Sequence, residues 1–172
     1  MKLIILNGSS CSGKSTTLRK IMEQKDHLFW LSQDSIKWLF SKYSYENNHK
    51  DLRQVILDLA ESVFKIKYDV IFDSPLYKEF RQKLIELAIK YGYEIIEINL
   101  ELDYNTALER FKERIKNAML TPEKNRKISN TSIDRFKELT EIYNKEKNSS
   151  AITFRTDRLG TEKISEEIMK LL

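Results

Sequence analysis

The stretch Gly8-Ser9-Ser10-Cys11-Ser12-Gly13-Lys14-Ser15-Thr16 decides the fold of this 172-residue chain. It fits the pattern G-x-x-x-x-G-K-[ST] without a mismatch. The apolar run Lys2–Leu6 precedes it, and a helical pattern that begins at Leu18 follows it. A Gly/Ser-rich turn that matched by chance would not need to lie between a strand and a helix. We therefore interpret the stretch as a loop that holds the phosphates of a nucleotide.

The residue types in this loop each suit phosphate binding. Gly8 and Gly13 let the backbone turn tightly and approach oxygen atoms without a Cβ in the way. Lys14 can bring a mobile positive charge to the β- and γ-phosphates, and the Ser15 hydroxyl can bind Mg²⁺. The loop N–H groups and the start of the helix point toward the phosphates. ATP and Mg²⁺ are therefore the expected cofactors, and the expected nucleotide-binding residues are Gly8, Ser10, Cys11, Ser12, Gly13, Lys14, Ser15 and Thr16.

Strand and helix patterns alternate along the rest of the chain. Further strands are predicted at Leu28–Leu31, at Asp69–Phe72, within Tyr93–Leu102 and at Ala151–Phe154, with helical patterns between them. Alternation at this spacing predicts an α/β three-layer sandwich, in which a five-stranded parallel sheet is covered by helices on both faces. Ligands of such sheets bind at the carboxyl ends of the strands.

Composition limits the remaining possibilities. Four glycines and two prolines leave little linker material, so we expect one domain over residues 1–172. A single cysteine and the lack of a signal-like or membrane-spanning segment favour the cytoplasm. The net charge of +4 is mild, and basic residues alternate with acidic ones on most predicted helices, as on solvated faces. Composition gives no indication of the oligomeric state.

Two acidic residues follow predicted strands at the edge where the phosphate loop lies. Asp34 could cap the next helix, but it could also accept the proton of an attacking hydroxyl. Asp73 ends the apolar strand Asp69–Phe72, as expected for a carboxylate that supports Mg²⁺. We predict Asp34 as the general base and Asp73 as a metal ligand.

Arg110 and Arg114 are four residues apart and share one face of a predicted helix. They precede an aperiodic, Lys/Arg/Asn-rich segment at about 115–131, which we interpret as a small helical lid. We predict that the two arginines contact the transferring phosphoryl group; Arg126 and Lys127 could also reach it. The alternative is a pair of exposed charges interleaved with glutamates.

Together these motifs resemble the small P-loop kinases that include phage-type polynucleotide 5′-hydroxyl kinases. The resemblance covers most of the chain and implies a P-loop NTPase fold. It also implies Asp34 as base, Lys37 and Arg81 as acceptor-binding residues, and a lid with Arg110 and Arg114. The family has an arginine where this chain has Lys37, so bidentate phosphate recognition is lost there. Many P-loop kinases hold adenine after the fifth strand, which implies that Thr156 binds the base.

The stretch Ile4–Ser10 and the pair Asp34-Ser35 also resemble chloramphenicol phosphotransferase and its relatives. The sequence therefore predicts a Mg²⁺/ATP-dependent kinase whose acceptor is a hydroxyl, with a single-stranded nucleic-acid end or a nucleoside-like hydroxyl preferred. A small-molecule kinase or a nucleoside monophosphate kinase is the alternative among enzymes. A nucleotide-binding switch without an acceptor is the alternative from another class.

Overall fold

A five-stranded parallel sheet organises the molecule in the computed structural model, which describes residues 1–73, 77–119 and 132–172. The strand order is β2-β3-β1-β4-β5, so β1, which leads into the phosphate loop, is central. This confirms the predicted α/β fold with five parallel strands. The strands are β1 (Lys2–Gly8), β2 (Leu28–Ser32), β3 (Asp69–Asp73), β4 (Glu94–Glu101) and β5 (Ile152–Arg155).

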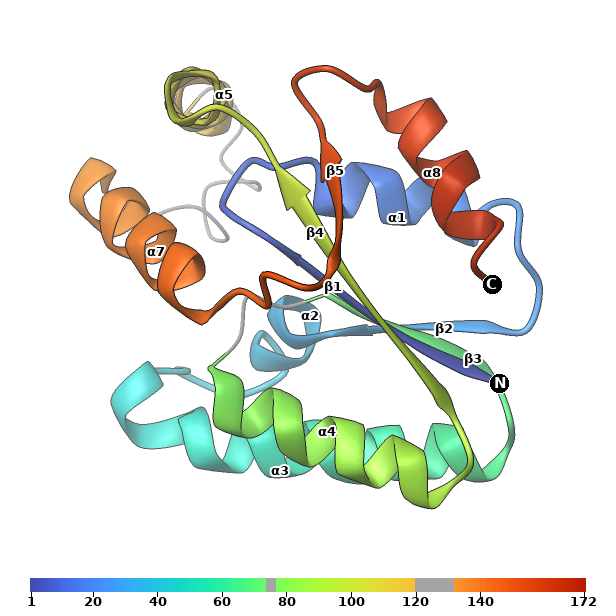
Figure 1. The fold of residues 1–172 in the computed structure, drawn as a ribbon. Coiled ribbons are helices and arrows are strands. Elements are labelled where there is room, and N and C mark those ends of the chain that lie inside the picture. The colour runs from blue at the N-terminus through green and yellow to red at the C-terminus, as the bar shows by residue number, and fades with distance from the viewer. Residues whose placement is uncertain (74–76, 120–131) are drawn as a thin grey trace.

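Helices cover both faces of the sheet (Figure 1). On one face α1 (Lys14–Met22) packs against α8 (Thr161–Met169), and on the other α3 (Tyr45–Lys65) packs against α4 (Lys78–Lys90). The short α2 (Gln33–Lys37), α5 (Tyr104–Met119) and α7 (Ile133–Glu146) lie toward the carboxyl ends of the strands. None of the helices in the described ranges is long and apolar enough to span a bilayer.

Local sequence accounts for where these elements begin and end. Ser44 and Ser132 cap α3 and α7, because each hydroxyl accepts a hydrogen bond from a backbone N–H three residues later. Asp103 caps α5, because its carboxylate accepts from the N–H groups of Asn105 and Thr106. Gly92 follows α4 with a φ of 78°, a left-handed conformation that glycine adopts without strain.

The alternation of side chains along β1 divides the core in two. Leu3 and Ile5 face α3 and α4, whereas Ile4 and Leu6 face α1 and α8. A third, smaller cluster joins α5 to α7 through Ala107, Phe111 and Phe136. The predicted lid at about 115–131 falls mostly outside the described residues, as do Arg126 and Lys127.

Candidate active site

Among the helices of the described ranges, α1 is distinguished by a first turn with neither a side-chain cap nor an acidic residue. Its N-cap residue is Gly13, no side chain bonds to the first turn, and that turn holds no acidic residue. By contrast, α2, α3 and α7 have both a serine cap and an acidic residue in their first turn. Free N–H groups at a helix N-terminus are a ready site for an anion. The phosphate-binding prediction for Gly8–Thr16 therefore fits the geometry of the loop.

Gly8 and Gly13 are required for different reasons. A Cβ on Gly8 would lie 2.4 Å from Ser12 Oγ and 2.8 Å from the Leu100 carbonyl oxygen, so the loop passes too close to β4 for any side chain. Gly13 has space around it, but its φ of 89° is strained for an L-residue. The tight turn depends on both positions.

Lys14 folds back over its own loop. Its Nζ donates hydrogen bonds to the Gly8 carbonyl at 2.5 Å and the Ser9 carbonyl at 2.9 Å. Loss of hydration lowers the pKa of the ammonium to about 8, although Asp73 and Asp34 oppose this shift. The Lys14 side chain is thus held at the site where a phosphate would arrive, with its charge poorly solvated.

Asp73 ends β3 on the face of the sheet that α1 covers. Burial raises the pKa of its carboxyl to about 6, against the lowering effects of Trp30, Lys14 and Ser32. Asp73 Oδ1 is buried and has no hydrogen-bond partner among the described residues; Trp30 Nε1 approaches the carboxylate without forming a regular hydrogen bond. An unsatisfied carboxylate oxygen beside a phosphate loop suits a hard cation with oxygen ligands, so Asp73 and Ser15 fit the predicted Mg²⁺ site.

Asp34 lies in the first turn of α2 but does not cap it. Ser32 is the cap, since its hydroxyl accepts from the Ser35 N–H at 3.3 Å. The Asp34 side chain is 80% exposed, and its carboxylate pairs with Lys37 Nζ at 2.5 Å. Asp34 also acts electrostatically on both Lys14 and Asp73. The structure therefore brings the predicted base, phosphate-binding lysine and metal ligand to one edge of the sheet.

Arg110 and Arg114 project from α5 toward the phosphate loop. Arg110 Nη1 donates to the Cys11 carbonyl at 3.5 Å, and the Arg114 guanidinium lies close enough to the Cys11 thiol to exert a lowering effect on its pKa. Burial nevertheless raises the pKa of that thiol, which keeps it protonated. Cys11 has a φ of 64° and contributes backbone to the loop. Both arginines are exposed and lie where a bound triphosphate would add negative charge.

Arg81 lies elsewhere, which argues against the predicted acceptor role. It is 7% exposed, its Nη1 donates to the Glu146 carbonyl at 3.0 Å, and its Nε lies 3.4 Å from Glu97 Oε2. Glu97 is aligned with Ile5, in the middle of β1 rather than at its carboxyl end. Arg81 thus joins α4 to β4 and to the end of α7.

Two other predicted binding residues are also occupied. The Thr156 N–H and hydroxyl both donate to the Glu101 carbonyl, at 2.7 and 3.3 Å, so neither donor is free for a base. Lys37 is held by Asp34 and lies 5.2 Å from the centre of the Trp38 ring. Adenine binding by Thr156 and acceptor binding by Lys37 remain predictions.

Ser32 and Trp30 lie beside Asp73 at the site, although no sequence motif marks either residue. Ser32 is the register partner of Asp73 across β2 and β3, and Trp30 lies two residues before it on the same face. Strand alternation would have found both residues, had the pairing of β2 with β3 been known.

The two shifted pKa values predict a bell-shaped pH dependence of kcat/KM for MgATP. The raised pKa of Asp73 leaves its carboxyl neutral below about pH 6, and the lowered pKa of Lys14 leaves its amine neutral above about pH 8. Only between these limits is Asp73 an anion and Lys14 a cation. Because the two groups interact, the apparent pKa values of the two limbs of the profile belong to the pair and not to either residue alone. Initial rates from about pH 5 to about pH 10 would measure the profile. An acid limb that persisted in Asp73→Asn would contradict its assignment to Asp73.

Comparison with known proteins extends this picture. Residues 3–141 match the AAA_33 family, described as an AAA domain. The chain belongs to this family. No curated protein matches the chain. Solved structures that share the α/β fold of this AAA_33 member include several that are less than 20% identical to it in sequence.

Three of these structures cover nearly the whole chain. A presumed kinase from Chloroflexus aurantiacus has a TM-score of 0.71 at 15% identity, covering 99% of this chain and 98% of its own. The APS kinase CysC of Mycobacterium tuberculosis, solved with AMPPNP and APS, has a TM-score of 0.65 at 14% identity, covering 99% and 96%. Kti12 of Chaetomium thermophilum, solved with ADP-AlF3, has a TM-score of 0.65 at 19% identity, covering 98% and 97%.

Proposed function

We propose that this AAA_33 member is a Mg²⁺/ATP-dependent kinase that transfers the γ-phosphoryl group to a hydroxyl, preferably the 5′-hydroxyl of a polynucleotide or a nucleoside-like hydroxyl. One observation carries the proposal: Lys14, Asp73 and the exposed Asp34 carboxylate meet beside an uncapped phosphate loop. Nucleotide binding alone accounts for Lys14 and Asp73. It gives no role to a second carboxylate at the same edge.

Each of these side chains would have one task. The loop N–H groups and Lys14 would hold the β- and γ-phosphates, and Arg110 and Arg114 would balance charge that develops on the transferring group. Asp34 would accept the proton of the acceptor hydroxyl as that oxygen attacks. Ser15 and Asp73 would hold Mg²⁺, which neutralises phosphate charge when bound.

The ion pair of Asp34 with Lys37 sets a condition on this mechanism. The Asp34 carboxylate already bonds to the Lys37 ammonium at 2.5 Å, at the position where it would meet an acceptor hydroxyl. An arriving acceptor would therefore have to draw Lys37 away from Asp34. Lys37 would then be free to contact an anionic part of the acceptor, the role that the family resemblance implies.

The acceptor class is tested by a panel assay with γ-labelled ATP. The panel holds 5′-hydroxyl oligonucleotides, nucleosides, nucleoside monophosphates and aminoglycoside- or phenicol-type alcohols. We expect label transfer to oligonucleotides at a kcat/KM about tenfold or more above that of the other alcohols. Preferred labelling of a small alcohol would support a small-molecule kinase, and labelling of a monophosphate would support a nucleoside monophosphate kinase. If no acceptor is labelled while ATP still binds, a nucleotide-binding switch is the better description.

A further inference from the structure

The N-terminal half of α3 and the N-cap of α4 meet in a group of rings and one guanidinium, which we call the acceptor-side cluster: Tyr45, His49, Arg53 and Tyr77. The Tyr45 ring stacks on His49 with 4.9 Å between centroids and lies 6.4 Å from the Tyr77 ring. The Arg53 guanidinium lies 5.2 Å from the centre of the Tyr77 ring. These contacts hold a flat aromatic surface and a cation next to each other.

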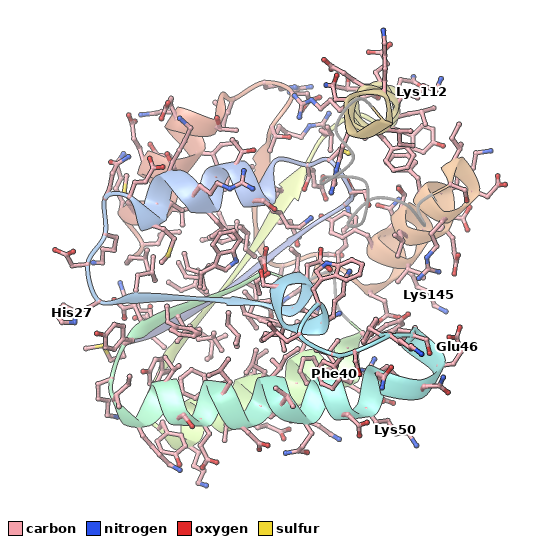
Figure 2. All side chains as sticks on the ribbon, turned by 180° about the vertical axis from the view of Figure 1, so that it is seen from behind. His27, Phe40, Glu46, Lys50, Lys112 and Lys145 are labelled. Carbon is pink, nitrogen blue, oxygen red and sulfur yellow. The ribbon has the colours of Figure 1, made fainter. Side chains whose placement is uncertain are left out.

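The acceptor-side cluster lies beside the candidate base. Tyr77 is four residues after Asp73 in the chain, and α2, which carries Asp34, contacts α3. Tyr43 lies within electrostatic range of Asp34, Tyr45 and Arg53 at once. In Figure 2 the labelled Phe40 and Glu46 mark the same region, where the first turn of α3 approaches α2.

Packing of the core does not account for the acceptor-side cluster. Tyr45 is 44% exposed, although an aromatic ring gains most from burial. Arg53 is half-buried, and no carboxylate among the described residues lies within ion-pair distance of it. A partly desolvated guanidinium without a counter-ion is costly until an anion pairs with it.

We propose that the acceptor-side cluster binds the acceptor's terminal nucleotide, with its base stacked on Tyr45 and an adjacent phosphate paired with Arg53. The inference rests on the proposed kinase function and names the part of the acceptor that the site recognises. Aromatic side chains stack on any base through its π-face, and a guanidinium pairs with phosphate through two parallel hydrogen bonds. Arg53 is the cation that lies against the rings of this cluster, whereas Lys37 lies beside Asp34 and would contact a different part of the acceptor.

The test compares two acceptors and three variants. The acceptors are a short 5′-hydroxyl oligonucleotide and the same strand with an abasic first residue, and the variants are Tyr45→Leu, Tyr45→Trp and Arg53→Gln. We expect Tyr45→Leu and Arg53→Gln to raise KM for the normal strand by about 5- to 100-fold, with KM for ATP unchanged. Tyr45→Trp should restore the normal KM, since the larger ring still stacks. Matched controls are Tyr91→Leu at the far end of α4 and Arg19→Gln on α1, both expected to leave the two KM values unchanged.

The abasic strand separates stacking from other effects. It should be a poor acceptor for the wild-type protein, and Tyr45→Leu should not weaken it further. Equal use of both strands, or an unchanged KM in Tyr45→Leu, would overturn the inference. Should the wild-type protein label no acceptor at all, the proposed function fails, and fluorescence anisotropy with the same strand decides the binding question separately. Binding that Tyr45→Leu weakens and Tyr45→Trp restores would support the subsite, and a lack of wild-type binding would refute it.

Discussion

Lys14→Ala is expected to abolish detectable phosphoryl transfer with any acceptor. The side chain is the cation that we propose to contact the β- and γ-phosphates, and its Nζ already lies over the loop, where it bonds to the Gly8 and Ser9 carbonyls. Without this cation, the negative charge on the γ-phosphoryl group in the transition state would lose a nearby positive charge that stabilises it. Single-turnover transfer with γ-labelled ATP would measure the loss.

The same substitution should leave the fold intact, because the poorly solvated ammonium of Lys14 is a cost to the folded protein rather than a gain. Its lowered pKa means that the charged form is less stable in the folded state than in water. The thermal midpoint of Lys14→Ala without nucleotide should therefore equal or exceed that of the wild type. An inactive variant with a clearly lower midpoint would point to misfolding instead, and an active variant would contradict the phosphate-loop mechanism.

Asp34→Asn is expected to lower kcat by about 10²-fold or more and to leave the affinity for ATP unchanged. The amide keeps the size of the side chain but cannot accept the proton of the acceptor hydroxyl. Since Ser32, not Asp34, caps α2, the substitution should not disturb the helix start. Steady-state kinetics and ATP titration together would measure both effects.

The matched control for Asp34→Asn is Asp58→Asn, which makes the same chemical change on α3. Asp58 is an exposed carboxylate on the outer face of α3, bonded to Gln54 at 2.8 Å and remote from the phosphate loop. Its substitution should leave kcat unchanged. Wild-type kcat in Asp34→Asn would remove Asp34 as the base and favour the nucleotide-binding switch.

Sequence patterns predicted all five strands and the convergence of Lys14, Asp34 and Asp73, because these features follow from local periodicity and from the common edge of a parallel sheet. They were less informative about long polar side chains. Arg81 was predicted to bind the acceptor, yet it joins Glu97 and Glu146, which are near it only after β4 and α7 have packed. Likewise, the loss of both Thr156 donors to Glu101 depends on the pairing of β5 with β4.

The N-cap of α2 was also not predictable from sequence patterns, although it involves only residues that are close in the chain. Ser32 and Asp34 are both good N-cap residues, and the choice between them depends on where β2 stops. The strand continues one residue beyond the predicted end at Leu31, so the helix starts at Gln33 and Ser32 becomes the cap. A shift of one residue thus decides that Ser32, and not Asp34, caps α2.

The small cluster of Ala107, Phe111 and Phe136 has a consequence for local stability. It joins α5 to α7 apart from the two large cores on either face of the sheet, and Cys11 of the phosphate loop packs against it. Among the described residues, separation of the two helices would expose this small cluster and leave both large cores buried, at a cost far below that of global unfolding. Backbone amides of α5 and α7 should therefore exchange with deuterium sooner than those of β1 and β3. Because Arg110 and Arg114 reach the phosphate loop from α5, a bound nucleotide would slow that exchange.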